Sequence, residues 1–397
     1  MNDAKGSAAS HRGLTVGIIA CAVVAVIGVA LWMVQLSGGM IQTGMRNLDS
    51  WGFYITLFMF FVGLSAGGLI ISSIPNAFGM KGFGDISRVA IWTSICCTCV
   101  AIGFVVVDLG GPLRLWELFV YSNLSSPLMW DIIVLGTYLI LSCVYLWAQI
   151  QAERGKVSAV ALRIVSVIAL VTAVLVHSVT AWIFGLQQGH EMWHTALLAP
   201  WFVSSALVCG TALVMAIVIG LRRAGYLELE QDNVVRLAKL LGAFVLVDLY
   251  FFGCDLLTEG FPGGAGAEVV ALLTQGPLAP YFWFEIIGCA VCAVICLTPA
   301  LRRNGLLVAA SLLAIAGIFC KRVQLLVGGF QIANLDLPFA MNSMSITYAD
   351  GTLADAYANL VYWPTPLEFG VTLGVVALGF LIFFLGLKFL PLRPAEK

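Results

Sequence analysis

Charged residues are scarce in this chain. Asp, Glu, Lys and Arg make up 10% of its 397 residues, whereas hydrophobic residues make up 61%, and the mean hydropathy is +1.00. A typical soluble domain carries about 25% charged residues, so this composition excludes an ordinary soluble protein and indicates a protein embedded in a membrane. The net charge of −1 also excludes the strongly basic surface that nucleic-acid binding requires.

Histidine is scarce as well, and of the four histidines only His177 lies deep within an apolar stretch. A haem b inside a membrane needs paired axial histidines, so we expect no haem. The 11 cysteines form neither a C-x-x-C-H motif nor a ferredoxin-type run. We interpret them as small packing residues without disulfides, and predict no iron–sulfur cluster and no metal site in this chain. His190 and His194 lie in a short loop, where we expect loop or partner contacts.

Long apolar runs are abundant instead. A membrane-spanning helix needs about 20 apolar residues, and the period-2 alternation of a membrane barrel is absent. The sequence therefore predicts an all-α polytopic membrane protein. No A-x-A cleavage pattern follows the first run, which we interpret as a retained helix. The ten predicted helices cover residues 14–36, 51–74, 86–108, 127–150, 161–187, 195–221, 234–258, 278–301, 305–327 and 365–390.

Basic residues are concentrated in alternate loops. Sixteen of the 20 Lys and Arg lie at the N-terminus, in every second loop and at the C-terminus, and the opposite loops hold only Arg46 and Arg114. Loops rich in Lys and Arg stay in the cytoplasm, so we predict that both termini are cytoplasmic. An even number of helices requires the same arrangement.

The chain also shows signs of an internal duplication. His177 and Lys321 are 144 residues apart, and each is followed by Gly at +8 and Gln at +10. Asp108 and Asp255 end two other helices at a similar offset. We predict two four-helix units, helices 2–5 and 6–9, in a parallel repeat flanked by helices 1 and 10. The corresponding boundaries are 1–50, 51–190, 191–330 and 331–397.

Ionisable residues inside the predicted helices gather in the outer half, and the inner half is expected to be apolar. A lipid-soluble redox carrier needs an apolar entrance and a proton acceptor, and His177 with Asp108 or Asp131 meets that need. Structural roles stay open as alternatives, because a buried His can bond to a neighbouring helix without taking part in any reaction. Asp131 and Glu285 lie near the starts of their helices, where a carboxylate can also interact favourably with the helix dipole.

Several other features have structural interpretations. Lys321 and Arg322 are expected to form ion pairs that hold helices together, or to take part in a proton path, with partners drawn from Asp248, Asp255 and Glu285. The glycines of the stretch 63–68 predict close helix packing. An aromatic belt at the outer surface accounts for Trp51, Trp116, Trp182, Trp193 and Trp363.

Five motifs follow one another along the first half of the chain. They are Trp51-Gly52-Phe53-Tyr54 with the glycines of 63–68, Asp108-Leu109-Gly110 with Pro112 and Arg114, Ser126-Pro127-Leu128-Met129-Trp130, His177-Ser178, and Trp193-His194-Thr195-Ala196-Leu197-Leu198-Ala199-Pro200. In this order they resemble the NrfD/PsrC-type membrane subunits of bacterial respiratory complexes. The resemblance implies a subunit of the bacterial inner membrane that exchanges electrons between menaquinone or menaquinol and a ferredoxin-like iron–sulfur partner. That partner would serve a catalytic subunit, such as a molybdopterin enzyme.

Carried onto this chain, the resemblance implies a quinone pocket in the first unit. Its catalytic residues would be His177, Asp108 and Asp131, with Tyr54, Arg114 and Trp182 beside the quinone. Two alternatives stay open, a secondary transporter built on the parallel repeat and a structural membrane anchor. The long outer connection 328–364, with Asp336, Asp350 and Asp355, is expected to be either a partner contact or a solvated loop.

Overall fold

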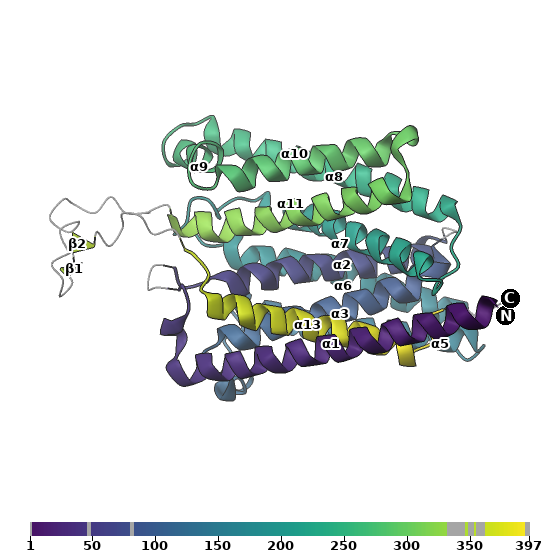
Figure 1. The fold of residues 1–397 in the computed structure, drawn as a ribbon. Coiled ribbons are helices and arrows are strands. Elements are labelled where there is room, and N and C mark those ends of the chain that lie inside the picture. The colour runs from purple at the N-terminus through teal and green to yellow at the C-terminus, as the bar shows by residue number, and fades with distance from the viewer. Residues whose placement is uncertain are drawn as a thin grey trace.

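The protein consists almost entirely of long helices. The computed structural model describes residues 2–45, 49–79, 83–331, 346–347, 353–354 and 362–393. Within them, ten helices are long and apolar enough to cross a membrane, which confirms the predicted number (Figure 1). They are α1 (Asn2–Gly38), α2 (Phe53–Phe78), α3 (Gly84–Asp108), α5 (Pro127–Glu153), α6 (Ala159–Gly185), α7 (Leu198–Arg223), α8 (Gln231–Gly260), α10 (Ala279–Leu297), α11 (Asn304–Gln331) and α13 (Pro366–Phe389).

Short elements join the long helices. They are α4 (Glu117–Val120), α9 (Ala265–Thr274), the 3₁₀ turns η1 (Met40–Gln42), η2 (Pro112–Arg114) and η3 (Pro299–Leu301), and the antiparallel strands β1 (Ile346–Thr347) and β2 (Leu353–Ala354). Arg46, Asp336, Asp350 and Asp355 lie outside the described residues.

Local sequence sets the helix ends. Proline occupies the first position of α5 and of α13, where its missing N–H costs nothing and its fixed φ suits the helix. Thr365 and Glu368 form a capping box at the start of α13, each side chain bonding to the other residue's backbone N–H. Gly79 adopts a left-handed conformation, with φ of 68°, and ends α2.

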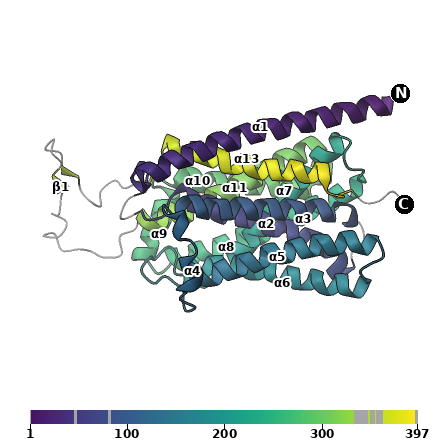
Figure 2. The same cartoon turned by 90° about the horizontal axis from the view of Figure 1, so that it is seen from below.

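The helices run roughly side by side, and both chain termini lie at the same end of the molecule (Figures 1 and 2). We call this the terminal end. The opposite end, the loop end, holds the described connecting residues 39–45, 49–52, 109–126, 186–197, 261–278 and 362–365.

Neighbouring helices form two closed sets of four. Helices α2, α3, α5 and α6 contact one another in that cyclic order and are called the first ring. Helices α7, α8, α10 and α11 do the same and are called the second ring. Helix α2 packs on α7 where the rings meet, and α1 packs mainly on α13, which packs on α3.

Glycines bring two helix pairs into backbone contact. A Cβ on Gly67 of α2 would lie 2.7 Å from the carbonyl carbon of Gly210 and 2.9 Å from the nitrogen of Thr211, both in α7. Gly28 of α1 meets Gly374 of α13 in the same way. The predicted role of the stretch 63–68 in close helix packing is therefore confirmed.

Two expectations about the interior are wrong. Trp193 is not part of a surface belt, because it is 2% exposed and its indole N–H donates to the carbonyl of Leu325 at 2.7 Å. The terminal half of the first ring is not apolar, because it buries the side chains of Ser72, Tyr145 and Gln149. These residues carry no charge, so the distribution of ionisable groups along the chain gives no sign of them.

Candidate functional site

The first ring contains a buried polar group near its loop end, formed by Asp131 of α5 and by Thr180 and His177 of α6. Thr180 donates its hydroxyl to Asp131 Oδ1 at 2.5 Å. His177 Nδ1 lies 3.1 Å from the carbonyl of Ala173, so Nδ1 carries the proton and Nε2 is left as an acceptor. Nε2 is buried and has no hydrogen-bond partner among the described residues. His177 and Thr180 are three residues apart on α6, so the same stretch of the helix carries a buried ring nitrogen without a hydrogen-bond partner in the described structure and a hydroxyl that bonds to a buried carboxyl.

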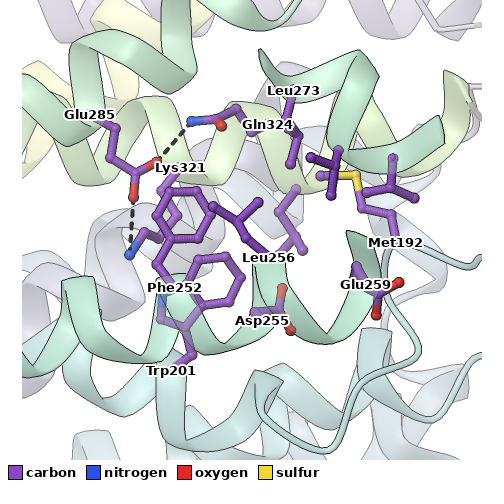
Figure 3. Close-up of a pocket in the computed structure, with 13 residues that line it drawn as sticks. Met192, Trp201, Phe252, Asp255, Leu256, Glu259, Leu273, Glu285, Lys321 and Gln324 are labelled. Atoms are coloured by element: carbon purple, nitrogen blue, oxygen red, sulfur yellow. Dashed lines mark hydrogen bonds and ion pairs between the residues drawn. The ribbon is translucent and has the colours of Figure 1, made fainter. Parts of the chain in front are cut away.

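The second ring contains a buried ion-pair group at a similar depth. Lys321 Nζ of α11 lies 2.5 Å from Asp248 Oδ2 of α8 and 3.1 Å from Glu285 Oε1 of α10. Gln324 donates to the other oxygen of Glu285 at 2.8 Å, and the dashed lines in Figure 3 mark both contacts to Glu285. The ammonium also lies 4.6 Å from the ring centroid of Trp201. This group has an ion pair at its centre, whereas the described part of the first-ring group has none.

A small cavity runs from this ion-pair group towards the loop end. It has a volume of about 20 Å³, which is room for one water molecule. Asp255 and Glu259 of α8 line its outer part, on the side away from Lys321 (Figure 3). Asp248 and Glu285, and not Asp255, supply the carboxylates that pair with Lys321 in the described structure.

Arg322 faces a different neighbour. Its guanidinium donates to the hydroxyl of Ser205 at 2.6 Å and lies 3.9 Å from the ring centroid of Phe202, both in α7. It forms no ion pair within the described part of the chain, and stacking on an aromatic ring stabilises it instead. Arg322 thus joins α11 to α7.

Tyr54 and Asp108 belong to a third group, at the junction of α1, α2, α3 and α13. Tyr54 donates to Gln35 Oε1 at 2.6 Å, and Gln35 donates to the carbonyl of Val107 at 3.1 Å. Asp108 Oδ1 is buried and has no hydrogen-bond partner among the described residues. Tyr54 therefore bonds to Gln35, and not to His177 or Asp131.

Glu368 ties the loop end of this junction together. Its carboxylate accepts the N–H groups of Gly44 and Thr365, both at 2.8 Å, and the hydroxyl of Tyr362. Burial, followed by the adjacent Glu368 carboxylate, raises the pKa of Tyr362, so this tyrosine keeps its proton. Phe53 N–H donates to the same hydroxyl at 2.8 Å.

Arg114 and Trp182 lie away from the buried groups. Arg114 pairs with Glu117 at 2.8 Å on the rim of an open hollow of about 620 Å³. Hydrogen bonding between the two raises the pKa of Arg114 and lowers that of Glu117. Trp182 is 38% exposed on α6. Met129 of α5 also lines the hollow, within one helical turn of Asp131.

The loop histidines make contacts within the chain. His190 Nδ1 lies 2.8 Å from the carbonyl of Gly329, and His194 Nδ1 lies 3.3 Å from that of Gly185. The described residues contain no group of three or more His, Cys, Asp or Glu placed to hold a metal ion.

Sequence reasoning missed Thr180 and Gln324, which bond to the two buried acids. Both lie three residues after the residue that marks the repeat, His177 or Lys321. The equal spacing could have identified them, because residues i and i+3 lie on one helix face and Thr180 and Gln324 therefore share a face with His177 and Lys321.

The fold and these groups define a polytopic helical membrane protein with buried ionisable residues in the loop half of both rings. Comparison with known proteins gives the family. Residues 41–334 match the family model described as polysulphide reductase, NrfD. The chain belongs to this family, and the resemblance stated from the motifs is confirmed.

Several relatives cover nearly the whole chain. A Halobacterium salinarum protein, named provisionally as a membrane subunit of dimethyl sulfoxide reductase, is 34% identical over 94% of this chain and 90% of its own length. A subunit of the selenate reductase of Mesobacillus selenatarsenatis is 26% identical over 94% and 93%. The Hdr-like menaquinol oxidoreductase integral membrane subunit of Archaeoglobus fulgidus is 27% identical over 95% and 93%.

Proposed function

We propose that this chain is the quinone-reactive membrane subunit of a respiratory reductase complex. It exchanges electrons between menaquinone or menaquinol and an iron–sulfur partner, which serves a catalytic subunit such as a molybdopterin enzyme. The observation that carries the proposal is the burial of two ionisable side chains, His177 and Asp131, in the first ring, with His177 Nε2 lacking a partner in the described structure. The relatives of this chain are named as subunits of reductases and of a menaquinol oxidoreductase.

The chemistry needs a proton acceptor at the quinol and a route for electrons away from it. Oxidation of one quinol releases two protons and two electrons, and reduction of one quinone takes up the same number. His177 Nε2 can accept a proton because Nδ1 is already protonated. Asp131 is a second buried group that can accept or donate a proton. Both electrons go to, or come from, the iron–sulfur partner.

The open hollow beside α5 is a suitable entrance for the quinone. Its volume of about 620 Å³ falls in the usual range for small-molecule sites. Its walls combine the apolar side chains of Leu109 and Met129 with the polar pair Arg114 and Glu117. We place the quinone ring between this hollow and Asp131, with Tyr54, Asp108 and Trp182 outside direct contact.

We infer that the two rings arose by duplication and then diverged. Thr180 bonds to Asp131 across α6 and α5, and Gln324 bonds to Glu285 across α11 and α10. The cyclic order of helix neighbours is also the same in both rings. In the second ring the position that matches His177 holds Lys321, which already contacts two carboxylates and has no counterpart of His177 Nε2. We therefore assign the quinone to the first ring alone.

The orientation follows from the distribution of charge. The terminal end collects most Lys and Arg, so we place it in the cytoplasm and the loop end outside. The buried ionisable groups then lie under the outer surface.

The test is the replacement His177→Ala in the complete complex, with His190→Ala as the control. Menaquinol-dependent reduction of the terminal acceptor should fall by about 100-fold or more, the usual contribution of a general base. Activity of the catalytic subunit with an artificial dye should not change. The described contacts of His190 are with the carbonyl of Gly329 in α11 and with the rings of Trp193 and Phe330, so its replacement should leave quinol activity near the wild-type level.

Two outcomes would contradict the proposal. Unchanged quinol activity in His177→Ala would remove its central residue. Loss of quinol and dye activities together, with loss of subunits from the complex, would support the membrane-anchor alternative.

A further inference from the structure

The connection between α3 and α5 carries large apolar side chains on its outside. Five of them, in residues 112–124, are 55% to 89% exposed and lie outside the set of residues that lines the open hollow. None of the four described residues of α4, which belongs to this segment, is buried. An exposed apolar patch marks contact with a membrane or with another protein. The five residues are Leu113, Trp116, Phe119, Val120 and Leu124.

The other side of the 112–124 segment faces the hollow. Leu115 and Leu118 line it, together with Arg114 and Glu117. These two charged residues pair with each other at 2.8 Å, so the segment carries no net charge. The segment is therefore one wall of the hollow and separates it from whatever covers the apolar side.

The second ring provides an internal comparison. Its matching connection, between α8 and α10, contains α9, which turns Val269 and Leu273 inward to 3% and 4% exposure. Both side chains line the small cavity of the second ring. The outward side of α9 holds the small or acidic residues Ala265, Glu268 and Ala271. Helix α9 thus buries its apolar side against its own ring, whereas the 112–124 segment turns its apolar side away from the first ring.

The segment lies at the level where the bilayer core ends. Helices α3 and α5 contain 25 and 27 residues. At 1.5 Å per residue they are about 38 Å and 40 Å long, which exceeds the bilayer core of about 30 Å. The segment joins the loop ends of these two helices, and α4 lies beside the start of α5 (Figure 2). This is the depth of the lipid headgroups and the first part of the acyl chains.

The apolar side of the segment also continues a lipid-facing surface. Ile133, Ile140, Val144 and Trp147 form an outward stripe along α5 and are 41% to 66% exposed. Such side chains on a spanning helix face acyl chains. The stripe begins within two turns of the start of α5, next to the segment.

The composition of the apolar side suits lipid better than a protein partner. Its main polar atom is the indole nitrogen of Trp116, whose ring lies 6.4 Å from that of Tyr121. Trp and Tyr are enriched where a membrane meets water. A protein interface, in contrast, carries a polar rim and about one hydrogen bond per 100–200 Å².

We propose that the 112–124 segment lies in the bilayer leaflet at the loop end, with its apolar side among the lipids. Amphipathic segments of this kind enter about 5–10 Å into the boundary between headgroups and acyl chains. One wall of the hollow is then a lipid-embedded element and not a water-exposed loop. This lipid contact needs no quinone, so it goes beyond the proposed function and can be tested without it.

The first test replaces Phe119 by p-benzoylphenylalanine in the intact complex, in phosphatidylcholine liposomes with radiolabelled acyl chains. On irradiation this side chain takes a hydrogen atom from a neighbouring C–H group and forms a bond to that carbon, in lipid or in protein. We expect labelled lipid adducts at position 119 at a yield close to that at Ile140, in the middle of α5. Glu268, on the outward side of α9, is the matched position in the second ring and should give few.

Two outcomes would overturn the lipid contact. Adducts between position 119 and another subunit would show that a protein covers the apolar side. Adducts no more frequent than at position 268 would show that the segment lies in water. The replaced ring is exposed, so the exchange leaves the packing of the helices intact.

The second test rests on the proposed function and measures menaquinol oxidation in the same liposomes. Phe119→Asp puts a carboxylate at the lipid boundary, and Ala271→Asp is the matched change on α9. We expect Phe119→Asp to raise the KM for menaquinol by about fivefold or more, because the apolar contact is lost and a charge opposes lipid burial. The kcat should not change, and Ala271→Asp should leave both values near wild type.

The two proposals fail in different ways. Protein adducts, or none, at position 119 would overturn the lipid contact whatever the quinol activity. Lipid adducts at position 119 with an unchanged KM in Phe119→Asp would support the lipid contact and count against the hollow as the quinone entrance.

Discussion

Replacement of Lys321 by Met should destabilise the protein strongly. Lys321 and its two carboxylate partners are each 2% exposed or less, so water does not screen them. At 2.5 and 3.1 Å the two attractions are worth roughly 5–7 kcal/mol each at an effective dielectric constant of 20. Desolvation of the charges offsets much of this. Removing one partner of a buried ion pair typically costs about 3–5 kcal/mol, because a charge is left without compensation.

A double variant should regain the stability that the single variant loses. Lys321→Met with Asp248→Leu removes a cation and an anion together and fills the space with apolar atoms of similar volume. Replacing a buried pair by packed hydrophobic residues is often neutral or stabilising. The double variant should therefore recover most of the free energy of unfolding lost in the single variant.

The assay is unfolding of the purified protein by sodium dodecyl sulfate in mixed micelles, followed by circular dichroism. Lys388→Met is the matched control, since Lys388 is exposed near the end of α13. A single variant as stable as the control would refute the reasoning. So would a double variant that is less stable than Lys321→Met.

Two further predictions concern packing and pH. Gly67→Ala should lower the free energy of unfolding by about 1–3 kcal/mol or more, because the new Cβ meets the backbone of Gly210. Gly136→Ala is the control, since nothing lies within 4 Å of its new Cβ. It should be neutral or slightly stabilising in the same assay. Tyr362 has a raised pKa in the folded protein, so its contribution is present below its unfolded pKa of about 10 and is lost as pH rises above it. Tyr362→Phe should therefore be less stable at pH 8 but lose less stability between about pH 9 and pH 11, and an equal alkaline loss in both proteins would contradict this.

The helices could be predicted from the sequence because each apolar run is long enough to span a bilayer. The depth of His177 and Lys321 followed from their positions within those runs. The partner of Lys321 did not follow, because Asp248 and Asp255 are seven residues apart and share one face of α8. Only the relative heights of α8 and α11 select Asp248, and sequence alone does not give these heights.

The candidate pocket was less predictable than the fold. Trp182 is five residues after His177, which turns it about 140° away around α6 and explains why one side chain is exposed and the other buried. The buried uncharged polar side chains of α5 were overlooked because they carry no charge, and because a Ser hydroxyl in a helix can bond to the carbonyl four residues earlier. Ser142, for example, donates to Tyr138 O at 2.7 Å.

The pairing of α1 with α13 has a consequence for biosynthesis. Helix α1 is synthesised before α13, so it finds its main neighbour only after the helices between them have been made. Until then the Gly28 surface of α1 faces lipid, and the backbone contact with Gly374 cannot form. A chain that stops before α13 would leave α1 without its packing partner. Membrane quality-control proteases could recognise this unpacked helix and degrade the incomplete chain.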